Sequence, residues 1–269
     1  MFLENVTITR NKKLNEKFYH LSFRSAKIAR SISCGQFLFV KVSNTHDPLL
    51  RRPLSVAWVF GGQINIVYKV VGRGTALLAG KNEGDKLNVM GPLGKGFTHP
   101  FPEVNFNKAS SCSFNDDRKI ILVAGGIGIA SLISLTKMCV RKNVHLFYGV
   151  RTKKEFLSER FLSINRKNIT YATEDGSRGY KGFVTEVLEK YLKKSSNKKN
   201  YIYTCGPLEM LRNVVVLANK YNVDGEANLE ERMACGVGAC LGCATETAHG
   251  VKMVCKDGPV FSFSDLGWK

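Results

Sequence analysis

Four cysteines near the end of the chain have the spacing of an iron-sulfur site. In the run ERMACGVGACLGCATETAHGVKMVC they follow the order Cys-x4-Cys-x2-Cys-x11-Cys. Three thiolates on one tight loop with a distant fourth is the arrangement of plant-type [2Fe-2S] sites. The sequence therefore predicts that such a cluster is held by Cys235, Cys240, Cys243 and Cys255.

Glycines separate these cysteines at Gly236, Gly238 and Gly242. A loop that wraps a cluster and aims its backbone N–H groups at the sulfurs needs unusual φ values and small side chains, which glycine supplies. A four-cysteine zinc knuckle is the alternative, but it usually pairs two short cysteine hooks. Because three of the cysteines share one loop here, the spacing favours the cluster.

The composition is that of a globular protein with room for two domains and a small third module. Of the 269 residues, 44% are hydrophobic and 23% are charged. No apolar run approaches the ~20 residues of a membrane-spanning helix. Met1 to Arg10 alternates like a strand and lacks the features of a secretory signal. We therefore expect a cytoplasmic location and no membrane partner.

The other cysteines and the net charge are less informative. Cys34, Cys112, Cys139 and Cys205 are scattered along the chain, which does not suggest a disulfide framework. The formal net charge of +18 favours association with acidic partners or nucleic acid. The basic residues form no stripe interleaved with aromatic residues, however, so a solvated surface is the better interpretation and no nucleic-acid partner is expected.

Residues 1–98 predict an antiparallel β-barrel or sandwich of about six strands, because short alternating or aromatic-rich runs are broken by turn residues. Gly61-Gly62 lies between two runs and predicts a tight hairpin, since glycine reaches positive φ values. A short helix is expected after Gly74-Thr75. The six runs are VTITR, FYHLSFR, GQFLFVKVS, RPLSVAWV, QINIVYKVV and DKLNVMG.

The second part of the chain predicts a different architecture. Phe97 to Lys119 is polar and lacks periodicity, as a connecting loop does. Over residues 119–223 strands alternate with helices, which predicts a doubly wound parallel α/β domain that binds nucleotides at the carboxyl ends of its strands. Residues 224–269 are expected to form the small module, giving an α+β multidomain protein. Helices are expected after Gly128, around Glu155 to Leu162, around Val184 to Lys193 and around Leu208 to Tyr221.

Two motifs of the first domain could bind a phosphate-bearing ligand. In LRRPLS (50–55), Arg52 can offer a fork of donors to a diphosphate and Ser55 can hydrogen-bond a ring nitrogen, although such a motif is more often a solvated strand edge. VYKVVGRGT (67–75) leads from a strand into a Gly-x-Gly-Thr turn and a helix. The free N–H groups at a helix start attract an anionic phosphate.

Three motifs of the second domain end predicted strands, where ligands bind in such sheets. AGGIGIAS (124–131) occupies the place of a dinucleotide-binding turn, but Ser131 stands where the last Gly of Gly-x-Gly-x-x-Gly belongs. TEDGSRGYKG (173–182) and TCGPL (204–208) are the other two. Cys205 in the last motif could lie against a nicotinamide ring, and a buried strand-end cysteine is the alternative.

Taken in order, RRPLS, GRGT, AGGIGIAS, TEDGSRGYKG and TCGPLEM resemble the ferredoxin-NADP reductase superfamily, which pairs an FAD-binding barrel with a nucleotide domain. The ending LEERMACGVGACLGCATET, followed by VCKDGPVF, is similar to the electron-transfer subunits of type B dihydroorotate dehydrogenases. That resemblance implies FAD, a [2Fe-2S] cluster and NAD as cofactors. It also implies an FMN-containing catalytic partner that oxidises dihydroorotate in pyrimidine (UMP) biosynthesis, in a heterotetramer of two subunits of each kind.

The resemblance also implies roles for single residues. Arg52 is expected to face the FAD phosphates, and Ser55 and Cys205 are expected to be catalytic, at the reacting ring edge of the flavin and at the nicotinamide. Leu54 stands where the wider superfamily has an aromatic residue. The gap between Cys243 and Cys255 is short for the family, which implies a trimmed hairpin. The other residues expected to bind FAD are Pro53, Leu54, Val67, Tyr68, Lys69, Gly74 and Thr75, and those expected to bind the nicotinamide nucleotide are Gly125, Gly126, Gly128 and Asp175.

Hydride transfer moves two electrons, whereas an iron-sulfur cluster takes one at a time. A flavin between them can exchange a hydride on one side and single electrons on the other. We therefore expect electrons to pass from the FMN of the partner through the cluster and FAD to NAD+. One alternative is the small subunit of another flavin and iron-sulfur complex that serves ferredoxin, sulfur or hydrogenase chemistry. A second is a zinc-containing basic protein that binds nucleic acid.

Overall fold

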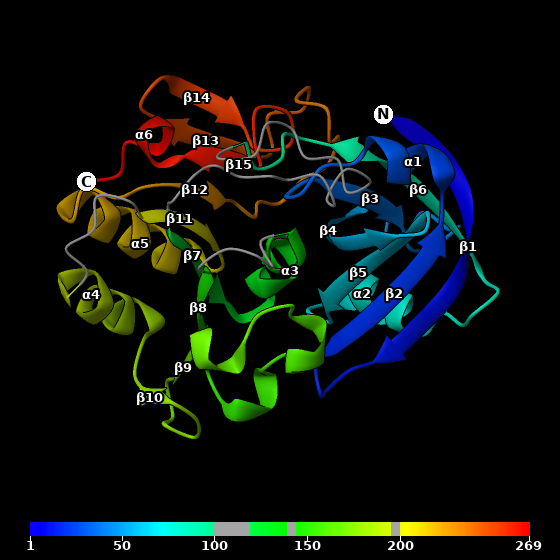
Figure 1. Cartoon of the computed structure of the whole chain (residues 1–269). Coiled ribbons are helices and arrows are strands. Elements are labelled where there is room, and N and C mark those ends of the chain that lie inside the picture. Colours follow the sequence, from blue (N-terminus) through cyan, green and yellow to red (C-terminus); the bar gives the residue numbers. More distant parts are fainter. Residues whose placement is uncertain (99–118, 139–143, 195–199) are drawn as a thin grey trace.

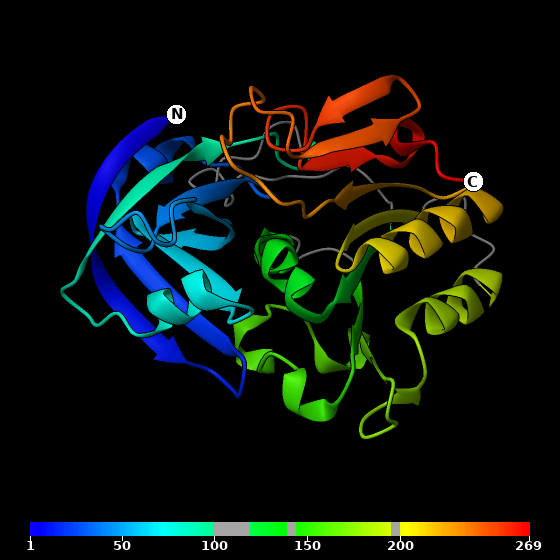
Figure 2. The same cartoon turned by 180° about the vertical axis from the view of Figure 1, so that it is seen from behind.

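The computed structural model describes residues 1–98, 119–138, 144–194 and 200–269. These residues form a closed β-barrel, a seven-stranded sheet and a two-stranded hairpin. In Figure 1 the barrel (blue to cyan) stands beside the sheet, with helix α3 (Ile129–Met138) between them, and Figure 2 shows the same arrangement from behind. The expected connecting loop after Thr98, including Cys112, lies outside the described residues, as does Cys139.

The first part of the chain forms the barrel that the alternating runs predict. Its strands are β1 (Phe2–Lys13), β2 (Phe18–Arg24), β3 (Phe37–Lys41), β4 (Arg52–Phe60), β5 (Gln63–Lys69) and β6 (Lys86–Leu93). They close in the order β1-β2-β5-β4-β3-β6, and neighbouring strands are antiparallel. Gly61 and Gly62, at φ values of 55° and 75°, form the predicted turn between β4 and β5.

Two short helices accompany the barrel. The predicted helix, α2 (Arg73–Ala79), begins in the GRGT turn. The other helix, α1 (Ala26–Ser31), has no counterpart in the sequence prediction. The Ser25 side chain accepts a hydrogen bond from the Ile28 N–H at 3.2 Å and so caps the first turn of α1.

The second part of the chain forms the predicted α/β sheet. Its strands are β7 (Lys119–Gly125), β8 (Val144–Val150), β9 (Ile169–Thr173), β10 (Tyr180–Lys181), β11 (Asn200–Cys205), β12 (Asp224–Asn228) and β15 (Val260–Ser262). The order is β10-β9-β8-β7-β11-β12-β15, with β15 antiparallel to β12 and all other pairs parallel. Predicted helices α4 (Val184–Lys194) and α5 (Leu208–Lys220) are also present.

The helices divide between the two faces of this sheet. Helix α3 contacts β7 and β11 on one side and the barrel strands β4 and β5 on the other, so it fills the space between the two domains. Helices α4 and α5 contact each other and the opposite face. None of the helices in the described residues is long and apolar enough to cross a membrane.

The helix expected around Glu155 to Leu162 is wrong. The chain forms two 3-10 turns instead, η3 (Lys153–Glu155) and η4 (Glu159–Phe161). The Phe156 ring packs 4.9 Å from Tyr148 in the sheet, while the Phe161 ring lies 5.9 Å from Trp58 of the barrel. Because Phe156 packs against the sheet and Phe161 packs against the barrel, tertiary contacts override the local helix propensity.

The C-terminal part is joined to the sheet. Strand β12 is nearly completely buried beside β11, although the sequence pattern indicated no strand there. After β12 the chain forms the cysteine-rich loop and the predicted hairpin of β13 (Ala244–Thr247) and β14 (Gly250–Met253). It then returns through β15 and ends with α6 (Phe263–Leu266). The division at residues 98, 119 and 223 stays a prediction.

Ion pairs to a buried carboxylate join the two domains. Glu155, 8% exposed, lies 3.0 Å from Lys17 Nζ and 3.6 Å from Lys69 Nζ, and both lysines belong to the barrel side. Burial alone raises the pKa of Glu155, but the hydrogen bond from Lys17 and the charges of Lys69 and Lys17 outweigh it. The pKa of this carboxyl is therefore below its ordinary value.

Replacing Glu155 by Gln leaves the two lysines without their counter-charge. We expect Glu155→Gln to lower the free energy of unfolding by about 1–3 kcal/mol at neutral pH. Because the folded pKa of Glu155 lies below its ordinary 4.5, the stabilisation is complete above that value and is lost as the pH falls through the folded pKa. Urea unfolding of both proteins should therefore show a difference that closes on the acid side.

The matched control is Glu16→Gln. Glu16 pairs with Lys154 at 3.3 Å, but both side chains are about two-thirds exposed, at 65% and 68%. An exposed pair of this kind contributes little, so we expect almost no change in stability. Equal losses in the two variants would contradict a specific role for Glu155.

Candidate functional site

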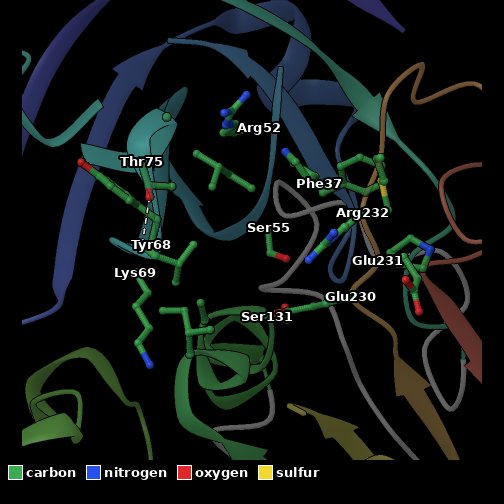
Figure 3. A pocket seen from close by; sticks show the side chains of 18 of the residues that line it. Phe37, Arg52, Ser55, Tyr68, Lys69, Thr75, Ser131, Glu230, Glu231 and Arg232 are labelled. Atoms are coloured by element: carbon green, nitrogen blue, oxygen red, sulfur yellow. Dashed lines mark hydrogen bonds between the residues drawn. The ribbon is translucent and has the colours of Figure 1, made fainter. Parts of the chain in front are cut away.

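A cavity of about 950 Å³ opens where the barrel, the start of α3 and the segment after β12 meet. Figure 3 shows its wall, with Arg52 and Thr75 on one side, Ser131 below, and Glu230, Glu231 and Arg232 opposite. The sequence motifs LRRPLS and GRGT, which lie far apart in the chain, therefore face one space. Of the residues expected to bind FAD, all nine line it: Arg52, Pro53, Leu54, Ser55, Val67, Tyr68, Lys69, Gly74 and Thr75.

Arg52 is held against the start of α2. Its Nη1 donates a hydrogen bond to the carbonyl of Leu50, and a Cβ on Gly74 would overlap the Arg52 guanidinium. The neighbouring Arg51 points elsewhere, because its Nη1 donates to the Asn88 carbonyl at 3.1 Å. Only a glycine at position 74 leaves room for this arrangement, which presents the Arg52 fork beside the backbone of the GRGT turn.

The side chain of Thr75 shapes the turn itself. Its hydroxyl oxygen accepts hydrogen bonds from the N–H groups of Val71 at 2.9 Å and Gly72 at 3.2 Å, and the hydroxyl donates to the Gly72 carbonyl at 3.0 Å. This cap fixes the backbone at the start of α2. The expected contact between Thr75 and the diphosphate stays a prediction.

Strand β5 contributes Val67, Tyr68 and Lys69 to the wall with different side-chain partners. The hydroxyl of Tyr68 donates a hydrogen bond to Asn11 Oδ1 at 3.0 Å. Tyr68 is only 2% exposed, and this burial raises the pKa of its phenol. Lys69 reaches Glu155 across the domain boundary. The cavity is therefore bordered by one cation that the nucleotide domain holds in place.

On the other side of the cavity, the turn between β7 and α3 places glycines where the sequence predicts them. Gly126 has a φ of 55° and a Cβ there would meet open space, so this position is accessible to a ligand. A Cβ on Gly128 would overlap the Cys205 carbonyl, and one on Gly125 would lie 2.6 Å from Met210 Sδ. Close packing therefore requires Gly125 and Gly128, and their nucleotide contacts stay predictions.

Cys205 meets two polar groups that the sequence did not assign to the site. Its Sγ lies 3.5 Å from Ser131 Oγ and 4.0 Å from Glu230 Oε1. Burial raises the pKa of the Cys205 thiol, with the charge of Glu230 adding to the effect. Cys205 is therefore a neutral thiol, with the oxygens of Ser131 and Glu230 as its polar neighbours.

Sequence reasoning could not have found Glu230, because one acidic residue before a cysteine loop carries no signal. Ser131 was noted only as a departure from the glycine pattern. Asp175 lies apart from these residues, exposed on the loop after β9, where its Oδ1 accepts hydrogen bonds from the Ser177 N–H at 2.9 Å and hydroxyl at 2.6 Å. It does not line the cavity, and its nucleotide contact stays a prediction.

Backbone N–H groups point at the sulfurs of the cysteine loop. Cys235 Sγ accepts from Val237 at 3.4 Å and Ala239 at 3.3 Å, and Cys255 Sγ accepts from Gly238 at 3.1 Å. The Val237 N–H contributes most to lowering the pKa of Cys235 to about 6, whereas burial raises the pKa of Cys255 to about 12. Donors aimed at thiolates are what the ligands of an iron-sulfur cluster require.

The loop conformation agrees with only part of the glycine argument. Gly236 and Gly238 have positive φ values of 75° and 81°, but Gly242 does not, and Leu241 takes a φ of 58° instead. Cys240 is exposed, while Cys243 and Cys255 are buried. Among the described residues, no three His, Cys, Asp or Glu side chains converge as the ligands of one metal ion do.

Comparison with known proteins defines the class first. The family described as "Oxidoreductase NAD-binding domain" matches residues 122–215, and "Iron-sulfur cluster binding domain of dihydroorotate dehydrogenase B" matches residues 230–267. The structure of NADH-dependent reduced ferredoxin-NADP oxidoreductase is similar at a TM-score of 0.76 and 26% identity, covering 98% of this chain and 90% of that one. Phthalate dioxygenase reductase shares the fold at a TM-score of 0.64 and 17% identity, with 97% and 94% covered. The chain is a NAD-linked flavin and iron-sulfur oxidoreductase subunit.

Curated relatives then define the family. The dihydroorotate dehydrogenase B (NAD(+)) electron transfer subunit of Geobacillus kaustophilus is 39% identical over an alignment of 274 positions, gaps included, and the alignment covers 98% of each chain. The corresponding subunit of Desulforamulus reducens is 36% identical over an alignment of 259 positions, which covers 93% of each chain. The chain belongs to the family of dihydroorotate dehydrogenase B electron transfer subunits. Its cofactors are FAD, a [2Fe-2S] cluster and NAD.

The contact between Gly74 and Arg52 yields a test of the FAD site. In Gly74→Ala the new methyl group must displace the Arg52 guanidinium. We expect FAD to bind about tenfold more weakly, because a displaced cation costs about 1.4 kcal/mol or more of binding free energy. The measurement is titration of the FAD-depleted protein with FAD, followed by flavin fluorescence.

Gly80→Ala, at the opposite end of α2, is the matched control. A Cβ on Gly80 makes only ordinary contacts, at 3.6 Å and 3.8 Å, its φ of −80° suits any residue, and Gly80 does not line the cavity. We expect FAD affinity close to that of the unaltered protein. Unchanged affinity in Gly74→Ala would show that Arg52 does not hold the cofactor.

Proposed function

We propose that this chain is the electron-transfer subunit of a dihydroorotate dehydrogenase, carrying electrons from the FMN of a catalytic partner through its [2Fe-2S] cluster and FAD to NAD+ during pyrimidine biosynthesis. One observation carries the proposal. Arg232 and Met233 line the cavity, and the first cluster cysteine, Cys235, follows two residues later. The two cofactor sites are therefore separated by a very short length of chain.

The residues of the chain would divide the task between binding and orientation. Arg52 and the start of α2 would hold the diphosphate of FAD, and Ser55 would face the reacting edge of the ring. Cys205, kept neutral by burial, would pack against the nicotinamide without adding charge to it. When bound, FAD supplies the exchange between hydride and single electrons.

The partner is expected to be an FMN-containing catalytic subunit, assembled as two copies of each chain. No general acid or base for dihydroorotate is identifiable in the sequence of this chain, which is consistent with that chemistry lying in the partner. The cytoplasmic location and the stoichiometry both stay predictions.

Co-expression with such a subunit, followed by anaerobic visible spectroscopy, tests the proposal. We expect a complex that contains FMN, FAD and iron, and dihydroorotate should bleach its flavin and iron-sulfur bands until NAD+ restores them. Flavin and iron bands that respond to NADH but never to dihydroorotate would favour another flavin and iron-sulfur complex. Zinc without flavin would overturn the assignment.

Replacing a cluster ligand should interrupt the path on one side of FAD only. We expect Cys240→Ser to abolish electron transfer between the partner and NAD+, while NADH oxidation with an artificial two-electron acceptor continues at the FAD. Stopped-flow absorbance and steady-state assays on the complex measure both steps. Cys34→Ala, at a buried cysteine of a different core region, is the control and should affect neither. Loss of both activities in Cys240→Ser protein that retains FAD would contradict this order of carriers.

The loop after β9 makes a prediction about nucleotide preference. Glu174 and Asp175 are exposed at the carboxyl end of β9, where their charges would repel the 2′-phosphate of NADPH. We expect Asp175→Asn, which keeps the oxygen that Ser177 uses, to shift the ratio of kcat/KM for NADPH over NADH upward by about tenfold. Asp224→Asn, at the opposite end of the parallel strands, should leave the ratio unchanged. An unaltered ratio in Asp175→Asn would remove Asp175 from the nucleotide site.

A further inference from the structure

Strand β3 presents its side chains to two different cores. Leu38 and Val40 point into the barrel and pack with its interior residues. Phe37 and Phe39 lie on the outer face, where they join the core that contains α5 and the C-terminal segment. They are 3% and 0% exposed, so this part of the barrel exterior is completely covered.

These two rings connect the cavity to the cysteine loop. Phe37 lines the cavity and stands beside Arg232 in Figure 3. Its ring centroid lies 5.7 Å from that of Phe39. The Phe39 ring in turn lies against Gly236, where a Cβ would be only 2.8 Å from Phe39 Cε2. Since Gly236 follows Cys235, packed atoms extend without interruption from the cavity to the first cluster cysteine.

The same core reaches the other buried ligands. It includes Met233, which also lines the cavity, together with Cys243, Val254 and Cys255. Apolar surroundings of this kind exclude water from a metal site and set the local dielectric, which influences the reduction potential. This core therefore shields Cys243 and Cys255 from water, while Cys240 is exposed.

We propose that Phe39 is a positioning residue for electron transfer, which holds the Cys235–Gly236 backbone at a fixed separation from the FAD cavity and keeps the space between them free of water. The inference rests on the proposed function, because it concerns the step between the two cofactors. That step moves one electron at a time between cluster and FAD, with no bond made or broken at Phe39. The electron donor and acceptor are the carriers already assigned.

The test is Phe39→Leu in the complex with its catalytic partner. We expect electron transfer from FAD to the cluster, followed by stopped-flow absorbance after mixing with NADH, to be about tenfold slower. The midpoint potential of the cluster, from a redox titration monitored by EPR, should rise, because water admitted beside the cluster stabilises its more negative reduced form. The initial reduction of FAD by NADH should keep its rate, since Phe39 is shielded from the cavity by Phe37.

Phe23→Leu is the matched control. Phe23 is also 0% exposed, but it lies on β2 inside the barrel and does not contact the cysteine loop. It should lose comparable stability in thermal unfolding with no change in the potential of the cluster or in the transfer rate. Phe39→Met removes about as much volume as Phe39→Leu but leaves a flexible side chain that can fill irregular space, so it should shift both quantities in the same direction and covers the case in which the leucine variant does not fold.

The outcomes separate this inference from the function itself. An unchanged potential and rate in both Phe39 variants, or the same changes in Phe23→Leu, would overturn the role of Phe39. A complex of the unaltered chain that lacked the cluster or FAD would instead refute the proposed function.

Discussion

A buried hydrogen bond between the domains anchors the segment that leads from the cavity to the cysteine-rich loop. Asn228, at the end of β12, donates from Nδ2 to the carbonyl of Gly35 at 2.9 Å. The bond ties the last parallel strand to the barrel and fixes the direction in which the chain leaves the sheet. The segment from Leu229 to Cys235 begins directly after this anchor. Because both groups are buried, breaking the bond leaves an unsatisfied carbonyl and costs about 1–3 kcal/mol.

The segment after this anchor contacts Cys205, borders the cavity and leads into the cysteine-rich loop. Glu230 reaches Cys205, Arg232 and Met233 border the cavity, and Cys235 begins the cluster loop. Electron transfer requires the barrel, the nucleotide sheet and the cysteine-rich loop to keep fixed relative positions. Helix α3 and the Glu155 ion pairs, which lie between the two domains, hold them in place.

Cysteine serves two opposite purposes in this structure, and the environment decides which. Cys205 is itself 0% exposed, and this burial raises the pKa of its thiol, which keeps its proton. Cys235 accepts two backbone N–H groups in an open loop, which lowers its pKa to about 6 and favours the thiolate that iron binds. The same side chain is therefore expected to be a neutral contact surface in one place and a ligand in the other.

The sequence alone determined whatever depends on neighbouring residues. The spacing of Cys235, Cys240 and Cys243 identified the cluster, and strand and helix periodicities predicted the barrel and the α/β sheet, because both depend on local geometry. The motifs at Arg52 and Gly74 were found separately, each by its own local pattern. Their convergence on one cavity could be expected only from the resemblance to known reductases.

Only the tertiary structure decided the rest. The 3-10 turns at Glu155, the strand β12, the approach of Glu230 and Ser131 to Cys205, and the contact of Phe39 with Gly236 all join residues that are distant in the chain. These contacts are stabilised by burial and, at Glu155, by charge pairing between the two domains. No short window of sequence contains both partners, and so no local pattern could predict these contacts.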